Sequence, residues 1–261
     1  MLSWGIIGFM SAAYDTFDYP SYWIGRDYEH RSEVVALKAF LHKIPKINTI
    51  LEIGAGFGRM IPFYSFRAKR VIVTEPSSKL LKIPRQKFKN KKNITFLQST
   101  IDNIPVKVRN GSVDLIIMIR VLHHIEDVGQ TINTVRKLLR NGGYFALEFA
   151  NKTHFKAVLT ELARGNINFI NNEEVEDRRS AKSIKKKTLP FFNYHPNAIN
   201  KILTDNGFEI IEKRSVSNIR SPLLKSIFSV DLLVYVESMV QKIFAPFNFG
   251  PSIFILAKKR A

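Results

Sequence analysis

A glycine-rich turn directly after a short apolar run constrains the fold of this chain more than any other feature. Residues 49–53 are mostly β-branched and aliphatic, and Gly54, Gly56 and Gly58 follow at alternate positions. The run predicts a buried strand, and the glycines predict a loop whose backbone takes positive φ and approaches a ligand with no Cβ in the way. Because open α/β sheets bind ligands at the carboxyl ends of their strands, this loop is the expected ligand site.

The spacing of these glycines departs from the dinucleotide-binding pattern Gly-x-Gly-x-x-Gly, because the third glycine comes one residue early. A pyrophosphate cradle of the NAD type is therefore less favoured. Residues 71–75 predict a second strand that ends in Glu75, about 20 residues after the loop, where a carboxylate accepts hydrogen bonds from ribose hydroxyls. The loop and the carboxylate together predict a nucleoside-type cofactor.

Three further segments continue the alternation of strands and helices. Residues 94–97 predict a third strand, residues 111–118 lead through a fourth strand into the segment 121–127, and Gly142 with Gly143 is expected to end a helix before a fifth strand. In this order the motifs resemble those of the class I S-adenosylmethionine-dependent methyltransferases. The branch of quinone-biosynthesis and other small-molecule methyltransferases is the most similar. The resemblance covers residues 47–151 well and the flanks loosely.

The resemblance implies an α/β fold with a doubly wound, seven-stranded, mostly parallel sheet whose last strand, residues 252–258, is antiparallel. We expect residues 1–46 to form an arm and a helix that cap the cofactor pocket. Residues 47–261 would then form the methyltransferase domain, with insertions at about 152–190 and 215–251. The expected helices are 32–42, 58–66, 77–89 with a kink at Pro84, 128–139 and 194–206, and the sixth strand is 208–214.

The resemblance also implies S-adenosyl-L-methionine as the cofactor and assigns residues to it. Thr100 stands where the family usually has an aspartate beside the adenine, and Asp102, two residues later, is an alternative contact. The predicted cofactor-binding residues are Glu52, Gly54, Ala55, Gly56, Gly58, Glu75, Pro76, Thr100, Ile101 and Ile119.

The segment after the fourth strand supplies the candidate catalytic residues Arg120, His123 and His124. A histidine titrates near neutral pH, so either ring could take a proton from the acceptor, or both could simply pack the following turn. Arg120 could bind an anionic group of the acceptor, or pair with Glu126 or Asp127. The residues directly after this strand, 119–121, include no proline, whereas amino-group methyltransferases that act on adenine or glutamine usually carry an Asn/Asp-Pro-Pro-aromatic turn there, so the sequence argues against that chemistry.

The N-terminal segment is dense in aromatic residues. Tyr14, Tyr22, Trp23 and Arg26 are predicted to contribute to a substrate pocket, because aromatic faces suit a sulfonium cation or an apolar acceptor. The alternative is an arm that packs as a small satellite core. The first ten residues are too short an apolar run to span a bilayer and lack the basic start of a signal peptide, and Met10 could be the real start. A cytoplasmic location is therefore expected.

The composition excludes several kinds of site and indicates which partners the chain could bind. With no cysteine, disulfides, thiolate zinc sites and cysteine nucleophiles are excluded, and six scattered histidines show no metal-ligand spacing, so we expect no metal. The net charge of +18 favours contact with polyanions or an anionic membrane. The basic stretches 79–92 and 178–187 are not interleaved with aromatic residues, so nucleic-acid binding is less favoured than a small-molecule or lipid-like acceptor. An RNA methyltransferase and a catalytically silent binding protein remain the alternatives.

Residues 215–251 are longer than a hairpin requires. Apolar residues between Leu223 and Phe244 recur at helical spacing, and Lys225, Asp231, Glu237 and Lys242 fall off that face. The pattern predicts a helical lid or homodimer face packed on the domain. The alternative is a surface, residues 223–244, that admits a lipid chain or rests on a membrane interface.

Overall fold

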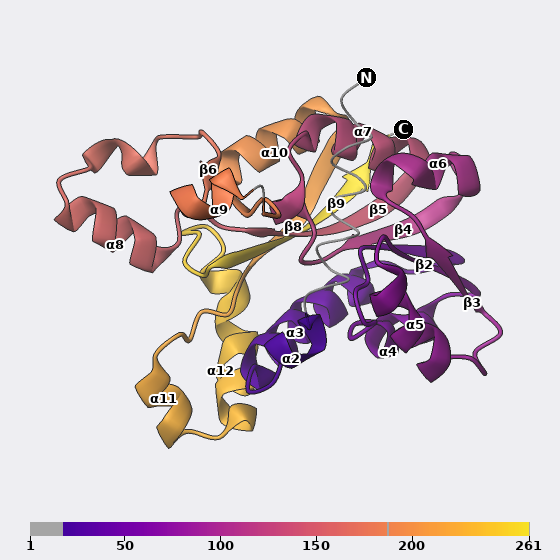
Figure 1. Ribbon diagram of the computed structural model, residues 1–261, viewed down its shortest axis with the longest axis horizontal. Helices are drawn as coiled ribbons and strands as arrows, with labels where there is room; N and C mark the ends of the chain where they lie inside the picture. The colour runs from indigo at the N-terminus through magenta and orange to yellow at the C-terminus, as the bar shows by residue number, and fades with distance from the viewer. Residues whose placement is uncertain (1–17, 187, 261) are drawn as a thin grey trace.

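The computed structural model describes residues 18–186 and 188–260, and a seven-stranded sheet forms its centre (Figure 1). The strand order is β3-β2-β1-β4-β5-β9-β8. The neighbours from β3 to β5 are parallel, whereas β9 is antiparallel to both β5 and β8. The predicted fold class is therefore confirmed. The strands are β1 Thr49–Ile53, β2 Arg70–Glu75, β3 Ile94–Gln98, β4 Val113–Met118, β5 Leu139–Ala150, β8 Phe208–Val216 and β9 Ser252–Lys259.

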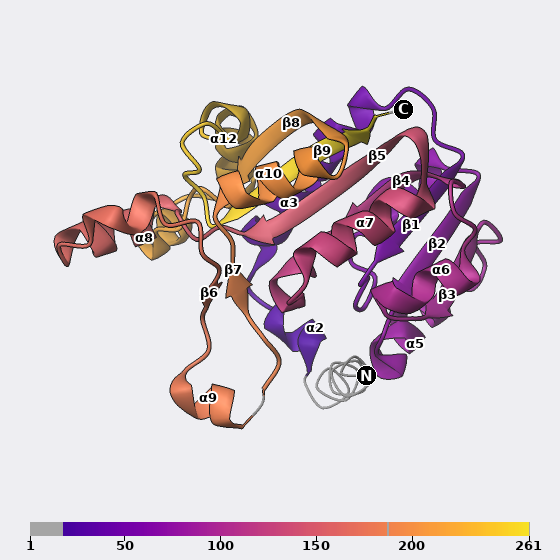
Figure 2. The same cartoon turned by 90° about the horizontal axis from the view of Figure 1, so that it is seen from above.

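Helices cover both faces of the sheet (Figures 1 and 2). On one face lie α3 (Asp27–Lys43) and α4 (Ile61–Tyr64), and on the other lie α6 (Ile104–Lys107), α7 (Val128–Leu138) and α10 (Pro196–Asp205). Successive residues of a strand point to opposite faces, so Phe254 and Leu256 pack towards α3, and Ile253 and Ile255 pack towards α7 and α10. Both layers bury apolar surface, and the loops at the carboxyl ends of the strands carry the site.

Two sequence-based expectations about this central unit are wrong. Helix α7 ends at Leu138 and β5 begins at the next residue, so Gly142 and Gly143 lie inside the strand and do not end the helix. Gly142 has a φ of 70° and the register of β5 against β4 shifts there, so these glycines serve an irregular strand pairing. The helix expected over 58–66 is only α4 followed by the 3-10 turn η1 (Ser65–Arg67). Gly58, with a φ of 77°, cannot join a right-handed helix.

The helix expected over 77–89 is α5 (Ser78–Lys87), which contains Pro84.

An aromatic residue pair joins the two insertions. The first insertion contains α8 (Phe155–Ala163), η4 (Ile167–Ile170), β6 (Glu176–Asp177) and α9 (Ala181–Lys185), and β6 pairs with β7 (Phe192–Asn193). The second insertion contains α11 (Pro222–Ile227) and α12 (Val230–Ile243). Phe155 of the first stacks on Phe249 of the second, with ring centroids 4.9 Å apart. Among the described residues, no helix is long and apolar enough to cross a membrane.

Helix α12 buries two polar side chains beside Leu233 and Val234, and it exposes several apolar ones to solvent. Glu237 and Gln241 are fully buried, whereas Tyr235 is 65% and Met239 57% exposed. Glu237 lies off the apolar face, as expected, but it is on the side that packs against the protein, whereas most of the apolar face is exposed. The outward residues Leu223, Ile227, Leu232, Tyr235, Met239 and Ile243 are termed the apolar face of α11 and α12.

Hydrogen-bond donors explain why a carboxylate occupies the buried side of α12. Glu237 accepts hydrogen bonds from the Tyr28 hydroxyl at 2.6 Å and from the backbone N–H groups of Ser217 and Asn218 at 2.8 and 3.1 Å. Burial raises the pKa of Glu237, although these donors oppose the shift. A buried polar group is tolerated when its hydrogen bonds are made, so this network selects which side of the helix faces inward.

Glu237→Ala should lower the free energy of unfolding by about 3 kcal/mol or more, because it leaves several buried donors without an acceptor. Asp231→Ala on the same helix is the matched control, since Asp231 is 83% exposed and pairs with Arg31 at the surface. Its loss should be less than about 1 kcal/mol. Urea denaturation measures both values, and equal losses would show that the buried network does not hold α12 in place.

Candidate functional site

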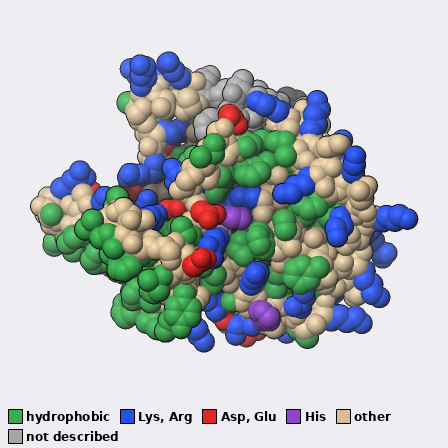
Figure 3. All heavy atoms as spheres, turned by 90° about the horizontal axis from the view of Figure 1, so that it is seen from below, with side chains coloured by type: hydrophobic (Ala, Val, Ile, Leu, Met, Phe, Trp, Pro, Cys, Tyr) green, Lys and Arg blue, Asp and Glu red, His purple; other side chains and the backbone are tan. Residues whose placement is uncertain are grey.

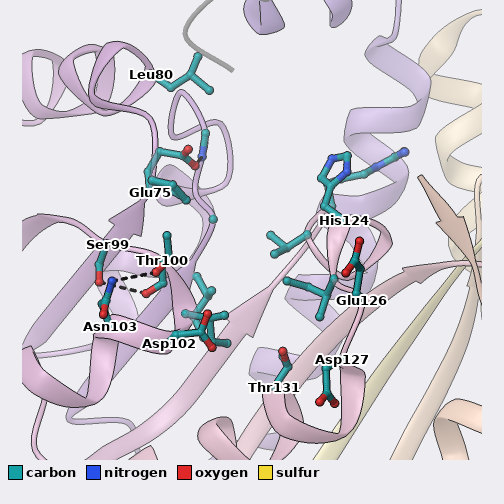
Figure 4. A pocket seen from close by; sticks show the side chains of 18 of the residues that line it. Glu75, Leu80, Ser99, Thr100, Asp102, Asn103, His124, Glu126, Asp127 and Thr131 are labelled. Atoms are coloured by element: carbon teal, nitrogen blue, oxygen red, sulfur yellow. Dashed lines mark hydrogen bonds between the residues drawn. The ribbon is translucent and has the colours of Figure 1, made fainter. Parts of the chain in front are cut away.

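A cavity of about 440 Å³ opens at the carboxyl ends of β1, β2, β3 and β4 (Figure 4). This volume suits a small-molecule ligand. Six of the predicted cofactor-binding residues line it, namely Gly54, Gly56, Glu75, Pro76, Thr100 and Ile101. Glu52, Ala55, Gly58 and Ile119 are not among the lining residues. The assigned roles stay predictions.

The carboxylate of Glu75 holds the glycine loop against the end of β2. It is buried, and its two oxygens accept hydrogen bonds from the backbone N–H groups of Gly56 at 2.8 Å and Ser77 at 3.0 Å. Each carboxylate oxygen has more than one lone pair. Glu75 also lies on the cavity wall, and its contact with ribose hydroxyls stays a prediction.

Each of the three loop glycines meets a different neighbour. A Cβ on Gly54 would lie 2.3 Å from Val121 Cγ2, and the φ of Gly54 is 70°. A Cβ on Gly56 would lie 3.2 Å from the Tyr19 ring. A Cβ on Gly58 would lie 2.6 Å from Pro84 on α5. Packing within the protein thus requires glycine at positions 54 and 58. Gly54 and Gly56 both line the cavity, and Gly56 donates its backbone N–H to Glu75.

Glu52 lies behind the loop. Its carboxylate accepts a hydrogen bond from the Tyr64 hydroxyl, and burial raises its pKa to about 7. Ala55 and Ile119 are buried in the core on the α3 face of the sheet. These residues back the loop from the interior, and any contribution of Glu52 to ordering the loop stays a prediction.

A buried carboxylate, Glu33, holds Arg120 at the cavity wall. Arg120 Nε donates to Glu33 at 2.7 Å, its backbone N–H donates to Glu148 at 2.7 Å, and Glu33 also binds Arg59. The suggested pairing of Arg120 with Glu126 or Asp127 is therefore wrong. Burial alone would raise the pKa of Glu33, but the two guanidinium groups outweigh it and hold that pKa below its usual value. Arg120 itself has a φ of 62°, so its backbone is strained.

The structure separates the two candidate histidines. His124 lines the cavity, and its Nδ1 lies 2.6 Å from the carbonyl oxygen of Pro190. A carbonyl only accepts, so Nδ1 carries the proton and Nε2 the lone pair. Burial lowers the pKa of His124 to about 4, which keeps the ring neutral at physiological pH. His123 is buried against His124 and Phe191 and does not line the cavity.

None of the described residues that were predicted to form a substrate pocket lines the cavity, although an aromatic residue near them does. Tyr19 lines it, with its ring 5.8 Å from that of Phe57 in the glycine loop, although the site prediction omitted it. The same aromatic density that suggested its neighbours was the available signal. Tyr22 packs against Arg26, Trp23 packs against Arg59, and none of these lines the cavity. Tyr14 and the suggested start at Met10 lie outside the described residues.

Three of the further lining residues, Asn103, Gln130 and Thr131, carry no signal of their own in the sequence. Asp102, the alternative adenine contact, lines the cavity, and Asn103 donates a hydrogen bond to the Thr100 hydroxyl at 3.2 Å (Figure 4). Gln130 and Thr131 of α7 line it as well. They come to the site because α7 begins directly after the segment that carries His124.

Within residues 18–186 and 188–260, no group of three His, Asp or Glu residues is placed to hold a metal ion.

Comparison with known proteins gives matches to methyltransferases. Residues 51–147 match a family described as the methyltransferase domain. A polyketide methyltransferase, ustM from Ustilaginoidea virens, is 28% identical over 126 residues, which are 44% of this chain and 29% of that protein. The chain spans less than a third of the length of the curated relatives it matches.

Solved structures show the same fold. A methyltransferase from Thermotoga maritima has a TM-score of 0.60 at 16% identity, over 96% of this chain and all of that one. The 1,6-didemethyltoxoflavin-N1-methyltransferase from Burkholderia thailandensis, solved with S-adenosylhomocysteine, has a TM-score of 0.61 at 12% identity, over 98% of this chain and 87% of that one. Residues 51–147 therefore match a methyltransferase domain, and the solved structures have the same fold as this chain.

Gly54→Ala should weaken binding of S-adenosylhomocysteine by at least about tenfold, because the added methyl displaces Val121 or the loop. Gly111→Ala is the matched control, since Gly111 has a similar φ of 67° but nothing within 4 Å of its Cβ position. It should cost only about 1 kcal/mol of backbone strain and leave the affinity unchanged. Calorimetry and urea denaturation measure the two effects. Equal behaviour of the variants would mean that close packing against Val121 is unimportant.

Proposed function

We propose that this chain, which contains a class I S-adenosylmethionine-dependent methyltransferase domain, methylates a small-molecule or lipid-like acceptor. The observation that carries the proposal is the position of His124 and Arg120 on the wall of the cavity that Glu75 also lines. Figure 4 places His124 across the cavity from Glu75. The similarity to a polyketide methyltransferase supports a small-molecule acceptor.

The cofactor, when bound, supplies an electrophilic methyl group on a sulfonium. A bond forms between the acceptor atom and the methyl carbon while the methyl–sulfur bond breaks, and its electron pair goes to sulfur. The chain then has to orient the acceptor and remove its proton. His124 suits the second task, because the hydrogen bond from Nδ1 to Pro190 fixes the ring and leaves the lone pair on Nε2.

The low pKa of His124 and the positive charge of Arg120 favour an acidic acceptor group. A histidine whose pKa is about 4 is a weak base, so it takes protons efficiently only from an acidic group. Arg120, held by Glu33, places a positive charge at the same wall. That charge would stabilise the anion left by deprotonation. We therefore propose an acceptor with an acidic C–H or O–H group, such as a carbon between two carbonyls or a phenol.

His124→Gln should lower turnover about a hundredfold or more while leaving the affinity for S-adenosylhomocysteine unchanged, because only the proton acceptor is lost. Glu75→Ala should instead weaken that affinity at least about tenfold. His42→Gln is the control, since His42 is exposed on α3. Incorporation of labelled methyl groups into a panel of dicarbonyl compounds, phenols, lipids and total RNA measures turnover.

The panel also separates the candidate functions. Labelling of RNA without labelling of any small molecule or lipid would overturn the proposed acceptor class in favour of an RNA methyltransferase. Full activity of His124→Gln on a small acceptor would remove the proton-transfer role but keep the acceptor class.

We also propose that the apolar face of α11 and α12 rests on a membrane surface or on a second copy of the chain. Large apolar areas are seldom left in water, and the charge of +18 favours an anionic surface. Replacing both Tyr235 and Met239 with Ser should abolish flotation with anionic vesicles or a concentration-dependent dimer, without unfolding the exposed helix face. Val106→Ser is the control, because Val106 is 85% exposed elsewhere. A wild-type protein that neither floats nor dimerises contradicts the proposal.

A further inference from the structure

A second cavity, of about 330 Å³, lies where the two insertions meet. Its walls come from α8, η4 and the β6–β7 pair of the first insertion, and from Arg220, which follows β8. Strands β5 and β8 run in the same direction, since both are antiparallel to β9. The segments that follow them therefore leave the same edge of the sheet as the cofactor loops, and the two cavities share no lining residue.

Positive charge exceeds negative charge in this second cavity. The lining residues include four cations, Lys156, Arg164, Arg178 and Arg220, and two carboxylates, Glu161 and Glu176. The carboxylates are already paired, Glu161 with Arg164 at 2.7 Å and Glu176 with Arg178 at 2.8 Å. Among the described residues, Lys156 and Arg220 have no ion-pair partner. The cavity thus retains two uncompensated positive charges.

His154 adds a neutral hydrogen-bond donor to the same cavity. Its Nδ1 accepts the backbone N–H of Ala157 at 3.2 Å, so the ring proton is on Nε2. Burial, together with the charges of Arg220 and Arg178, lowers the pKa of His154 to about 4. Its pKa shift is consistent with the convergence of these cations, and the ring contributes an N–H group without adding charge.

We propose that this cavity binds a phosphate group, supplied either by a lipid headgroup or by a soluble phosphate ester. Two cations without carboxylate partners and an imidazole N–H match a group that carries more than one negative charge and several acceptor oxygens. Arg220 comes from one insertion and Lys156 from the other. The site therefore exists only because the two insertions pack together, with Phe155 stacked on Phe249.

The surroundings of the cavity suit the lipid source. Of the 24 exposed large hydrophobic residues among those described, 15 lie in the segments 155–170 and 223–247 of the two insertions. Figure 3 shows hydrophobic side chains gathered at the left of the view, with basic side chains among them. A headgroup phosphate in the cavity would place the apolar part of its lipid beside this surface.

Titration with inorganic phosphate at constant ionic strength, followed by calorimetry, tests the site itself. Arg220→Ala and Lys156→Ala should each weaken phosphate binding by about fivefold or more. Arg109→Ala and Lys185→Ala remove one exposed charge each elsewhere and should leave it unchanged. Affinity for S-adenosylhomocysteine, measured on the same variants, should stay constant, so the outcome is separate from that of the methyltransferase proposal.

Vesicle flotation then identifies the source of the phosphate. Wild-type protein should float with phosphatidylcholine vesicles that contain about one fifth phosphatidic acid, and not with phosphatidylcholine alone. Loss of flotation in Arg220→Ala but not in Arg109→Ala supports a lipid headgroup, whereas phosphate binding without flotation supports a soluble ester. Absence of phosphate binding, together with equal flotation of Arg220→Ala and Arg109→Ala, would overturn the proposal.

Discussion

The site depends on the ion pairs that the fully buried carboxylate of Glu33 forms with two arginines. It binds Arg59, directly after the glycine loop, and Arg120, directly after β4. Burying a carboxylate costs several kcal/mol unless cations and hydrogen bonds compensate it, and here two guanidinium groups do so. Removal of either arginine leaves a buried charge under-compensated. Helix α3 therefore ties the glycine loop to the segment after β4, while Glu148 binds the backbone N–H of Arg120.

The same helix carries the second insertion on its other side. Tyr28 donates to Glu237 of α12, and Gln241 donates to the backbone carbonyl of Ser32 at 2.9 Å. Glu33 is the next residue along the chain. Helix α3 therefore binds Arg120 through Glu33 and also packs against α12, whose outer side belongs to the apolar face of α11 and α12.

Both cavities follow from the direction of the strands. The order β3-β2-β1-β4-β5 reverses between β1 and β4, and the cofactor cavity lies at this switch point. The segments after β5 and β8 leave the sheet at the same edge, and they form the cationic cavity. The same edge of the sheet thus carries two cavities with different linings, one at the family-matched residues and one, rich in cations, in the insertions.

The sequence by itself determined the strands from β1 to β4, the glycine loop and Glu75 as a cavity residue, because those signals are local: β-branched runs, glycine spacing and a carboxylate at a strand end. The sequence did not predict contacts between residues that lie far apart along the chain. Gly142 resembles a helix stop, but pairing with β4 places it in a strand. Helical spacing revealed an apolar face on α12 but not its direction, since Tyr28 lies 209 residues from Glu237. Likewise, Arg120 meets Glu33 across 87 residues. Only the folded chain brings such groups together, so only tertiary structure could decide which polar side chains are buried and which apolar ones remain outside.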